Sequence, residues 1–389
     1  MSANPVSSSL FILKPLTCDE PPRLMRHLRV PSAQTAHWIQ RCKEHGWYAI
    51  GFGVQSLDGD RLIPLVNSAP SRNDAVWQGF PVLEREATEK RIQHWTAHLE
   101  PSLQQEYAEE FPQSFEILGD VLLVKIPEAM QTVATEIAEA MLKRYPNVRI
   151  VCHDEGVTGE FRVRNLNPIH SRDSSLSTQT YVKEHGHRIE VDPSIAYYSA
   201  RLSEQRKKTF ESIQTFASEF NRPLRIVDAY AGVGPAMAYL YTDAKLTESV
   251  HVNDMNPETT PLLERNMERF ENKRKSPGMF SISCLDASNL ATECSELNGT
   301  SDVLLVNLPH DGITHLRDLT PLLNPNRALI CGWTIQEKEA SSAVGSKLVR
   351  QFEAAGYAVQ SNTIESVKGF SPSKSMYRYE CVIESQTHR

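Results

Sequence analysis

The sequence predicts an α/β protein with a Rossmann-like parallel sheet in its C-terminal half, preceded by two smaller α+β modules. Short apolar runs alternate with helical patterns from residue 224 onward, and a glycine-rich turn follows the first of these runs. Alternation of strands with helices is typical of a parallel sheet. A chain of 389 residues is also too long for a single hydrophobic core, so we expect several domains.

The glycine-rich turn predicts a nucleotide pocket at the carboxyl end of the first strand. The strand Leu224–Val227 leads to Asp228, and Gly232 and Gly234 lie in the turn after it, where glycine allows a ligand to approach the backbone closely. Asp254 follows the next strand, 20 residues after Gly234, a spacing at which an acid accepts hydrogen bonds from ribose hydroxyls. The alternative is a purely structural glycine turn, but Asp254 favours a cofactor.

The details of the turn indicate which cofactor it suits. Met237 stands where a dinucleotide-binding turn has its third glycine, and the chain has no G-K-[ST] phosphate cradle. The D-x-x-x-G-x-G pattern resembles the first motif of class I S-adenosylmethionine enzymes, in which the glycine backbone passes the amino-acid part of the cofactor.

Two further polar residues follow predicted strands and are expected at the same edge of the sheet. Asp286 comes after the strand 280–284, where an acid can accept from an adenine amino group; a turn aspartate is the alternative, and the adenine contact is favoured. Asn307 follows the strand 302–306 and opens the sequence Asn-Leu-Pro. Its amide can pair with a substrate base, and a helix-capping role is the alternative. Two last strands, 357–364 and 376–383, predict an antiparallel sheet edge.

The upstream chain divides by pattern into smaller parts. We expect a small N-terminal docking module over residues 1–70, which includes an apolar run at 10–13, and a linker with a mixed-charge helix over 71–110. An α+β module over residues 111–200 contains a strand pair around Gly119-Asp120, an amphipathic helix over 127–145, and strands at 148–151 and 160–163. The sheet domain then covers residues 201–389.

Composition limits the function classes. The net charge of −7 gives no global signature of nucleic-acid binding, so an RNA partner would need a local basic patch. Seven dispersed cysteines form no C-x-x-C pair, and the spacing of His185, His187 and His310 fits no zinc pattern, so we predict no metal. The sequence contains no run of about 18 apolar residues and no basic leader. We therefore expect a cytoplasmic protein without a membrane segment.

Several segments together resemble the archaeal and eukaryotic tRNA (guanine-37, N1)-methyltransferase family. The sequence has DAYAGVGP, NDMNP and NLP in this order, the upstream pieces FEILGDVLLVKIP, GEFRVRNL, VKEHGHRIEVD and AYYSARLSEQR, and the late KGFSPSK. The resemblance covers roughly residues 110–385. The sister family, the wybutosine-pathway aminocarboxypropyl transferases, typically has Glu in place of Asp254 and lacks NLP. Asp254 and Asn307 therefore favour methyl transfer.

The resemblance implies a role for each matched residue. Asn307 would hold the target guanine, Glu184 would take its N1 proton, and Arg162 or Arg164 would contact O6 or a phosphate. The S-adenosylmethionine pocket would be lined by Asp228, Tyr230, Gly232, Gly234, Asp254, Met255, Asp286 and Asn307, with Tyr198 and Arg201 at its mouth. His185-Gly186 departs from the Asn-Gly of many archaeal members, and residues 167–180 lack the usual Leu-x-Gly-Glu. From the residues alone, a solvated charge before a strand is the favoured interpretation of Glu184.

The implied partner is the anticodon loop of a tRNA, whose target base must be turned out of its stack, and we expect the protein to act as a monomer. Basic side chains could form one RNA-binding face or merely solubilise helices: Arg162, Arg164, Lys183, Arg201, Arg206, Lys207, Lys208, Lys273, Arg274 and Lys275. Three hypotheses follow, namely N1-methylation of guanine 37, aminocarboxypropyl transfer to a wybutosine precursor, and non-catalytic binding of S-adenosylmethionine or RNA.

Overall fold

The computed structural model describes residues 24–88, 94–159, 161–369 and 371–386. The chain divides into two compact units, Met1–His94 and Trp95–Arg389, which are described separately. The apolar run at residues 10–13 lies outside the described residues.

The first unit is an antiparallel sheet with one helix packed against it. The strand order is β2-β3-β1-β4. The elements are β1 (Leu24–Pro31), α1 (Thr35–Glu44), β2 (Gln55–Leu57), β3 (Asp60–Pro64) and β4 (Val82–Glu86). Trp38 of α1 and Trp77 fill its core, with ring centroids 6.3 Å apart and no more than 1% exposure. Burial of two tryptophans supplies much of the apolar area that so small a unit requires.

The predicted linker over residues 71–110 is wrong, because its first part belongs to this unit. Strand β4 pairs with β1, with Val82 opposite Leu28, and Trp77 lies in the core. The centre of the expected mixed-charge helix, residues 89–93, lies outside the described residues; before it β4 ends at Glu86, and after it a 3-10 helix spans Trp95–His98. Trp77 and Val82, two apolar side chains in this polar stretch, pack into the core and make the stretch part of the first unit.

The second unit begins with a four-stranded sheet in the order β5-β6-β7-β8. The elements are α2 (Pro101–Glu106), β5 (Phe115–Leu118), β6 (Val121–Val124), α3 (Ala134–Arg144), β7 (Ile150–Thr158) and β8 (Val163–Ser171). The predicted hairpin around Gly119-Asp120 is confirmed, and α3 links the parallel pair β6 and β7. Strand β7 is longer than the predicted strand 148–151, and the predicted strand 160–163 is misplaced, since β8 only begins at Val163. The two strands form an extended antiparallel hairpin.

A second hairpin, β9 (Thr180–Glu184) and β10 (His187–Val191), joins this sheet to the C-terminal one. Gly119 has a φ of +58°, and a Cβ built there would lie 2.2 Å from the Thr180 Oγ1 atom, so only glycine fits where the β5–β6 turn meets β9. One core cluster contains Val182, Ile189 and Ile226. The hydrophobic core is therefore continuous across the expected boundary at residue 200.

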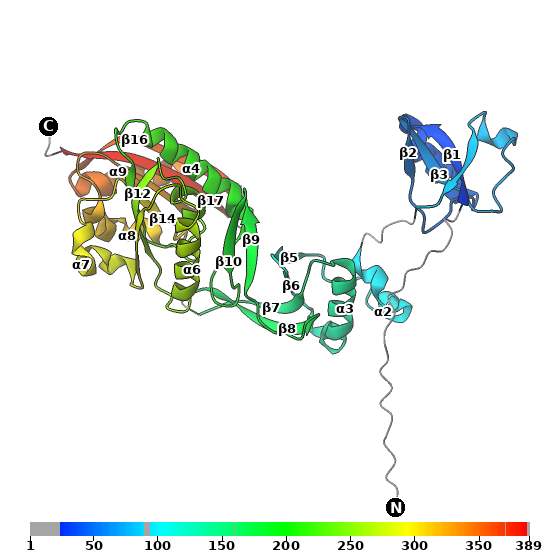
Figure 1. Ribbon diagram of the computed structural model, residues 1–389, viewed down its shortest axis with the longest axis horizontal. Helices are drawn as coiled ribbons and strands as arrows, with labels where there is room; N and C mark the ends of the chain where they lie inside the picture. Colours follow the sequence, from blue (N-terminus) through cyan, green and yellow to red (C-terminus); the bar gives the residue numbers. More distant parts are fainter. Residues whose placement is uncertain (1–23, 89–93, 160, 370, 387–389) are drawn as a thin grey trace, which may run out of the picture. The chain divides into compact units, whose positions relative to one another are not determined.

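The C-terminal sheet has seven strands in the order β13-β12-β11-β14-β15-β17-β16 (Figure 1). Its strands are β11 (Leu224–Asp228), β12 (Thr247–Asn253), β13 (Met279–Ser283), β14 (Val303–Val306), β15 (Ala328–Glu337), β16 (Tyr357–Gly369) and β17 (Lys374–Ser385). Strands β11 to β15 are parallel, and β17 runs antiparallel to β15 and β16, as the sequence predicts. Since β11 pairs with β12 on one side and β14 on the other, the carboxyl ends of these three strands meet at a switch point of the topology.

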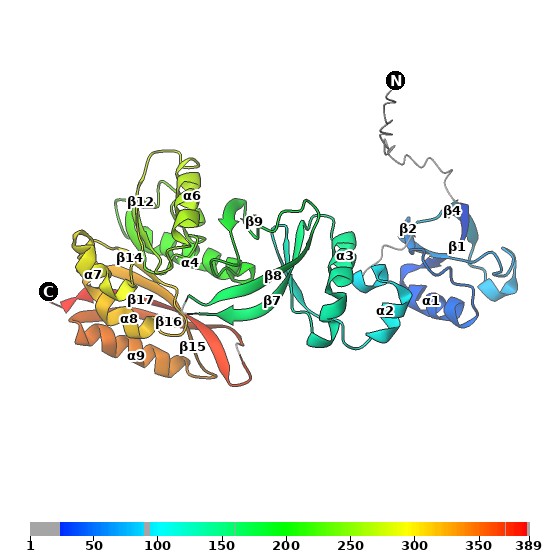
Figure 2. The same ribbon diagram turned by 90° about the horizontal axis from the view of Figure 1, so that it is seen from below.

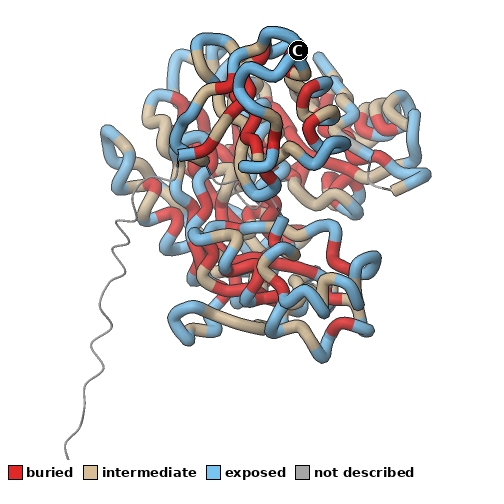
Figure 3. The backbone as a smooth tube through the Cα atoms, turned by 90° about the vertical axis from the view of Figure 1, so that its right-hand side faces the viewer, coloured by how far each residue is buried: buried red, intermediate tan, exposed pale blue. Residues whose placement is uncertain are grey.

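Helices cover both faces of this sheet (Figure 2). They are α4 (Ser203–Ala217), α5 (Met237–Leu240), α6 (Thr260–Glu271), α7 (Leu290–Glu293), α8 (Gly312–Leu319) and α9 (Ser341–Ala354). Alternate residues of β14 enter different core clusters, Val303 and Leu305 on the side of α4 and α6, Leu304 and Val306 on the side of α8 and α9. Two covered faces explain why the central strand β14 is apolar without interruption. Figure 3 shows buried stretches of the chain between exposed ones.

Candidate active site

The glycine turn after β11 is tied directly to the loop after β12. The Gly232 amide donates to the Asp254 Oδ2 atom at 2.8 Å, and the Ala231 amide donates to the Asn253 carbonyl at 2.8 Å. Gly232 and Gly234 have φ angles of +55° and +76°, a backbone region that favours glycine. A Cβ on Gly234 would lie 2.9 Å from the Leu263 Cδ1 atom, so this glycine lets α6 approach the turn closely.

Asp254 is positioned to accept further hydrogen bonds. Its Oδ1 atom accepts from the Asn256 amide at 3.0 Å and its Oδ2 atom from Gly232. Each carboxylate oxygen has a second lone pair, so both ribose hydroxyls of a ligand could still donate to it. Burial raises the pKa of Asp254 above its ordinary value, an effect that the two backbone hydrogen bonds oppose.

Asp228 is a second buried carboxyl at the same edge. Burial raises its pKa to about 7, opposed by the Tyr230 amide, which donates to the Oδ1 atom at 3.3 Å, and reinforced by the nearby charge of Asp254. Two carboxyls that share one buried edge favour a ligand with positive charge and hydroxyl donors.

Asn253 holds these loops together, a role that the sequence interpretation missed although it had singled out the segment Asn253-Asp254. Its buried amide donates to the carbonyl oxygens of Ala229 and Leu285 at 3.1 and 3.0 Å. Its Oδ1 atom accepts from the Leu285 amide at 3.0 Å. One side chain therefore fixes the loops that follow β11 and β13. The signal was a polar residue at the last position of a buried strand.

Two predicted cofactor residues have contacts at this edge that the sequence did not indicate. The Tyr230 hydroxyl lies 2.6 Å from the His315 Nδ1 atom of α8. Asp286 is exposed, and its Oδ1 atom accepts from the amide and the hydroxyl of Ser288 at 3.0 and 2.8 Å, which lowers its pKa. Asp286 is therefore a turn residue in this structure, and its other oxygen remains a predicted partner for adenine. Met255, in the loop after β12, is 37% exposed.

Asn307 follows β14 directly and is half-buried. The N-cap position of α8 is occupied by Asp311, so Asn307 does not cap that helix. The loop is held by the Pro309 carbonyl, which accepts from the Ile335 amide of β15 at 2.8 Å, and by the Leu308 carbonyl, which accepts from the Gly312 amide at 2.8 Å. The structure thus presents Asn307 on a fixed loop at the carboxyl edge of the sheet.

Glu184, the predicted general base, is buried and bonded to protein groups in this structure. Its role as a base stays a prediction, which the variant Glu184→Gln below separates from a structural role. Its side chain is 3% exposed and forms an ion pair with Arg206. The Arg206 Nε atom donates to the Oε2 atom at 3.0 Å, Tyr239 donates to Oε2 at 2.9 Å, and the Tyr198 hydroxyl and the Arg206 Nη2 atom donate to Oε1. These four donors occupy both acceptor positions of each carboxylate oxygen. Glu184 ties β9, α4 and α5 together.

Tyr198, predicted at the mouth of the cofactor pocket, belongs to this cluster. Burial and the hydrogen bond to Glu184 raise its pKa. The adjacent segment does approach the glycine turn, because the Tyr197 carbonyl is the nearest atom, at 3.9 Å, to a Cβ built on Gly232. Arg201 in the following turn is exposed. The structure therefore brings the segment, but not the Tyr198 hydroxyl, to the predicted pocket.

The two predicted arginines behave differently. Arg164 forms ion pairs with Glu116 and with Asp154, the latter at 2.7 Å, so its guanidinium is used within the sheet. Arg162 is exposed at the tip of the β7–β8 hairpin. The pKa of His310 is lowered by burial and then by the charge of Arg162, which places this hairpin tip near the loop that begins with Asn307. Of the two, only Arg162 is available to a substrate.

Part of the predicted basic face is also committed to internal contacts. Arg206 is 7% exposed in the Glu184 cluster. The Arg274 Nη2 atom donates to the Thr247 carbonyl at 3.0 Å, and Lys208 pairs with Glu365 at 2.6 Å. These residues therefore contribute little to a free RNA-binding surface.

Within the residues that the structure describes, no group of three or more His, Cys, Asp or Glu side chains could hold a metal ion. Over the same residues, no helix has the length and apolar character needed to cross a membrane.

The fold and this edge define a class I methyltransferase domain: a parallel sheet with an antiparallel seventh strand, a glycine turn after β11 and an acid after β12. Residues 180–354 match the TRM5/TYW2 methyltransferase domain, and residues 96–170 match the TYW2 N-terminal domain. The chain therefore contains a TRM5/TYW2 methyltransferase domain.

Individual relatives agree with this assignment. A curated relative, the tRNA (guanine(37)-N(1))-methyltransferase Trm5b of Pyrococcus abyssi, is 28% identical over 242 residues, which cover 61% of this chain and 66% of that protein, just under two thirds. The crystal structure of Trm5b from Pyrococcus abyssi has a TM-score of 0.63 at 22% identity and covers 92% of this chain and 99% of that one. A solved complex of aTrm5 with tRNALeu has a TM-score of 0.61 at 19% identity, with the same coverage.

We predict that Glu184→Gln mainly destabilises the protein. It leaves Arg206 buried without a charged partner, which costs about 3–5 kcal/mol, so the urea midpoint should fall while the activity per folded molecule is retained. Glu211→Gln is the matched control, because Glu211 forms only an exposed pair with Lys207 at 4.0 Å, worth at most about 0.5 kcal/mol. A Glu184→Gln protein with normal stability and a chemical rate reduced by orders of magnitude would restore the general-base role.

Asp228 predicts a distinct pH dependence of stability. Its pKa is about 7 in the folded state against an ordinary value of 3.8, so the folded state binds this proton more tightly. Its stabilising contribution is complete below pH 4 and is lost as the pH rises to 7. Relative to Asp228→Asn, the wild-type free energy of unfolding should fall by about a few kcal/mol across that window.

The measurement is urea unfolding of both proteins at pH 5, 6, 7 and 8. Asp286→Asn is the control of opposite sign, since the pKa of Asp286 is lowered and its contribution is lost only as the pH falls through the acid range. A difference between wild type and Asp228→Asn that does not change with pH would show that Asp228 titrates normally.

Proposed function

We propose that this protein transfers a methyl group from S-adenosylmethionine to N1 of guanine 37 in tRNA. The observation that carries the proposal is the shared edge of the sheet. There the loop with Gly232 is bonded to Asp254, and Asn307 stands on the neighbouring loop after β14. The loops after β11 and β12 suit a nucleoside cofactor. The loop after β14, which carries Asn307, suits a base that must be aligned with the cofactor.

The residues present fit S-adenosylmethionine. Gly232 leaves open backbone beside the turn, with only the Tyr197 carbonyl within 4 Å of a Cβ built there. Asp254 has lone pairs for the ribose hydroxyls, and Asp228 adds a second acidic group that favours a cation. When bound, this cofactor supplies a methyl group already activated by a sulfonium charge, so the protein chiefly has to align the two reactants.

On the substrate side, Asn307 can hold the edge of a guanine through both its carbonyl oxygen and its amide. Loss of the N1 proton places negative charge on the ring and on O6. Arg162, whose charge already acts on His310 in the Asn307 loop, can stabilise that charge. The target base must leave its stack to reach this edge.

The relatives' names and the tRNA complex of a structural neighbour support the substrate. The proposal includes the anticodon loop as the contact and the monomer as the working unit. It also places the protein in the cytoplasm, where the free thiols of its six described cysteines stay reduced.

Aminocarboxypropyl transfer to a wybutosine precursor is the second candidate, because residues 96–170 match a TYW2 N-terminal domain. The two activities leave different products from the same cofactor. Methyl transfer yields S-adenosylhomocysteine, and aminocarboxypropyl transfer yields methylthioadenosine.

The test is incubation with S-adenosylmethionine and an unmodified tRNA transcript that has guanine at position 37, followed by mass spectrometry of the RNA and of the cofactor product. We expect one added methyl group on guanine 37 together with S-adenosylhomocysteine, and no methylation when position 37 is adenine. Methylthioadenosine as the product would favour the second candidate. Cofactor binding without turnover would contradict both.

Two variants separate the roles of the loops. Asp254→Ala should weaken cofactor binding while tRNA binding is retained. Asn307→Ala should retain cofactor binding and lower the single-turnover rate by about 10²-fold or more. Isothermal titration and rapid-quench kinetics measure these quantities, and a normal rate for Asn307→Ala would exclude the assigned role.

A further inference from the structure

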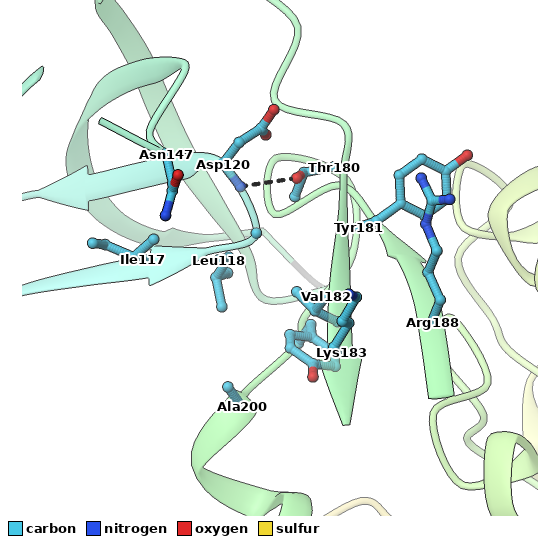
Figure 4. Close-up of a pocket in the computed structure, with 12 residues that line it drawn as sticks. Ile117, Leu118, Asp120, Asn147, Thr180, Tyr181, Val182, Lys183, Arg188 and Ala200 are labelled. Carbon is cyan, nitrogen blue, oxygen red and sulfur yellow. Dashed lines mark hydrogen bonds between the residues drawn. The ribbon is translucent and has the colours of Figure 1, made fainter. Parts of the chain in front are cut away.

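A groove with both apolar and charged lining residues opens between the β5–β6 turn and the β9–β10 hairpin (Figure 4). Its volume is about 650 Å³. Ile117 and Leu118 form one wall, and Lys183 and Arg188 stand on the hairpin opposite. None of the residues assigned to the cofactor or the base contributes to this groove except Tyr198, so its chemistry needs a separate explanation.

The two faces of the hairpin differ sharply. Val182, Glu184 and Ile189 point into the core, whereas Lys183 and Arg188 are exposed and directly opposite each other in the strand register. Like charges opposite each other in a sheet repel. Among the described residues, neither side chain forms an ion pair with an acid. Such a pair is suited to an anion from outside the chain.

Arg188 is held in place by an aromatic ring. Its guanidinium lies 3.7 Å from the centroid of the Tyr181 ring, and Figure 4 shows the two side chains together. The Tyr181 hydroxyl donates to Glu190 at 3.1 Å, which fixes the ring. A guanidinium stacked by its face keeps its N–H groups free at the edge, where they can donate to phosphate oxygens.

The surroundings of the groove are positive although the whole chain is acidic. Arg265 and Arg269 of α6 both pair with the single carboxylate of Glu190, at 2.8 and 3.0 Å. With Lys183 and Arg188, four cationic groups therefore face one acid. Asp120 at the other wall is neutralised by Arg149 at 3.0 Å.

The groove adjoins the candidate active site through one short segment. Tyr198 and Ala200 line the groove, and the carbonyl of the preceding Tyr197 is the atom closest to a side chain placed on Gly232. A polymer bound in the groove would thus run past the cofactor turn.

We propose that this groove binds the phosphodiester backbone of the substrate RNA next to the target nucleotide, with Lys183 and Arg188 as the phosphate contacts and Tyr181 as the residue that positions Arg188. This inference rests on the proposed function, because it takes the ligand to be the tRNA substrate. It assigns the contact to the β9–β10 hairpin instead of the basic helix α4, whose middle arginine is buried.

The test compares Lys183→Gln/Arg188→Gln with the matched control Lys347→Gln/Arg350→Gln, which removes the same charge from exposed positions of α9. Binding of the tRNA transcript is measured by fluorescence anisotropy at several salt concentrations. We expect the Kd of the groove variant to rise about 10-fold or more and the slope of log K against log salt to fall by about two, one for each lost phosphate contact. The Kd for S-adenosylhomocysteine should not change.

Tyr181 provides a second readout. Tyr181→Leu removes the stack and should raise the KM for tRNA with little change in kcat, whereas Tyr181→Phe keeps the ring and should restore most of the affinity. Tyr181→Leu binding as tightly as wild type would show that the stack does not position Arg188.

The outcomes separate the two proposals. If wild type methylates guanine 37 but the groove variant binds tRNA like the α9 control, the groove inference is wrong and the function stands. If wild type shows no methyl transfer while the groove variant still weakens tRNA binding, the proposed reaction fails and the groove remains an RNA site. A groove variant that binds normally in a protein without activity overturns both.

Discussion

The hydrogen bonds from the backbone amides of Gly232 and Asn256 to the Asp254 carboxylate organise the candidate site. They join the turn after β11 to the loop after β12, so that the two loops form one surface. Because the strands are parallel and adjacent, this surface lies at the carboxyl edge, beside the loop of Asn307. Burial raises the pKa of Asp254, and the same two hydrogen bonds lower it. They therefore favour the charged carboxylate, which can accept hydrogen bonds from a ligand.

A second buried interaction, the Glu184–Arg206 ion pair, fixes the elements that adjoin the candidate site. It links the hairpin that lines the RNA groove with α4, while Tyr239 adds the short helix that follows the glycine turn. Removing one partner of such a pair leaves a buried charge unsatisfied, which costs far more than the pair contributes. In this structure the acid that resembles a catalytic base in the sequence joins the hairpin to α4 and α5, so that one cluster bears on both the cofactor turn and the groove.

The sequence predicted the sheet domain well because its signals are local. Strands β11 and β14 are short apolar runs, Asp228 ends β11, and Asp254 and Asn307 directly follow β12 and β14, so their convergence follows from topology. The roles of Glu184, Arg164 and Arg206 could not be predicted, since charge alone does not reveal which acid faces which base across 22 or 48 residues of chain. The linker prediction was wrong for a related reason, because Val82 pairs with Leu28 of β1, which lies more than 50 positions earlier in the chain.

Hydrogen exchange with and without S-adenosylhomocysteine tests the central claim most directly. The account predicts that the ligand slows exchange in peptides covering residues 228–236 and 253–258 together, and that Asp254→Ala abolishes both effects. Protection confined to residues 117–120 and 180–191, or protection of only one of the two loops, would contradict the account.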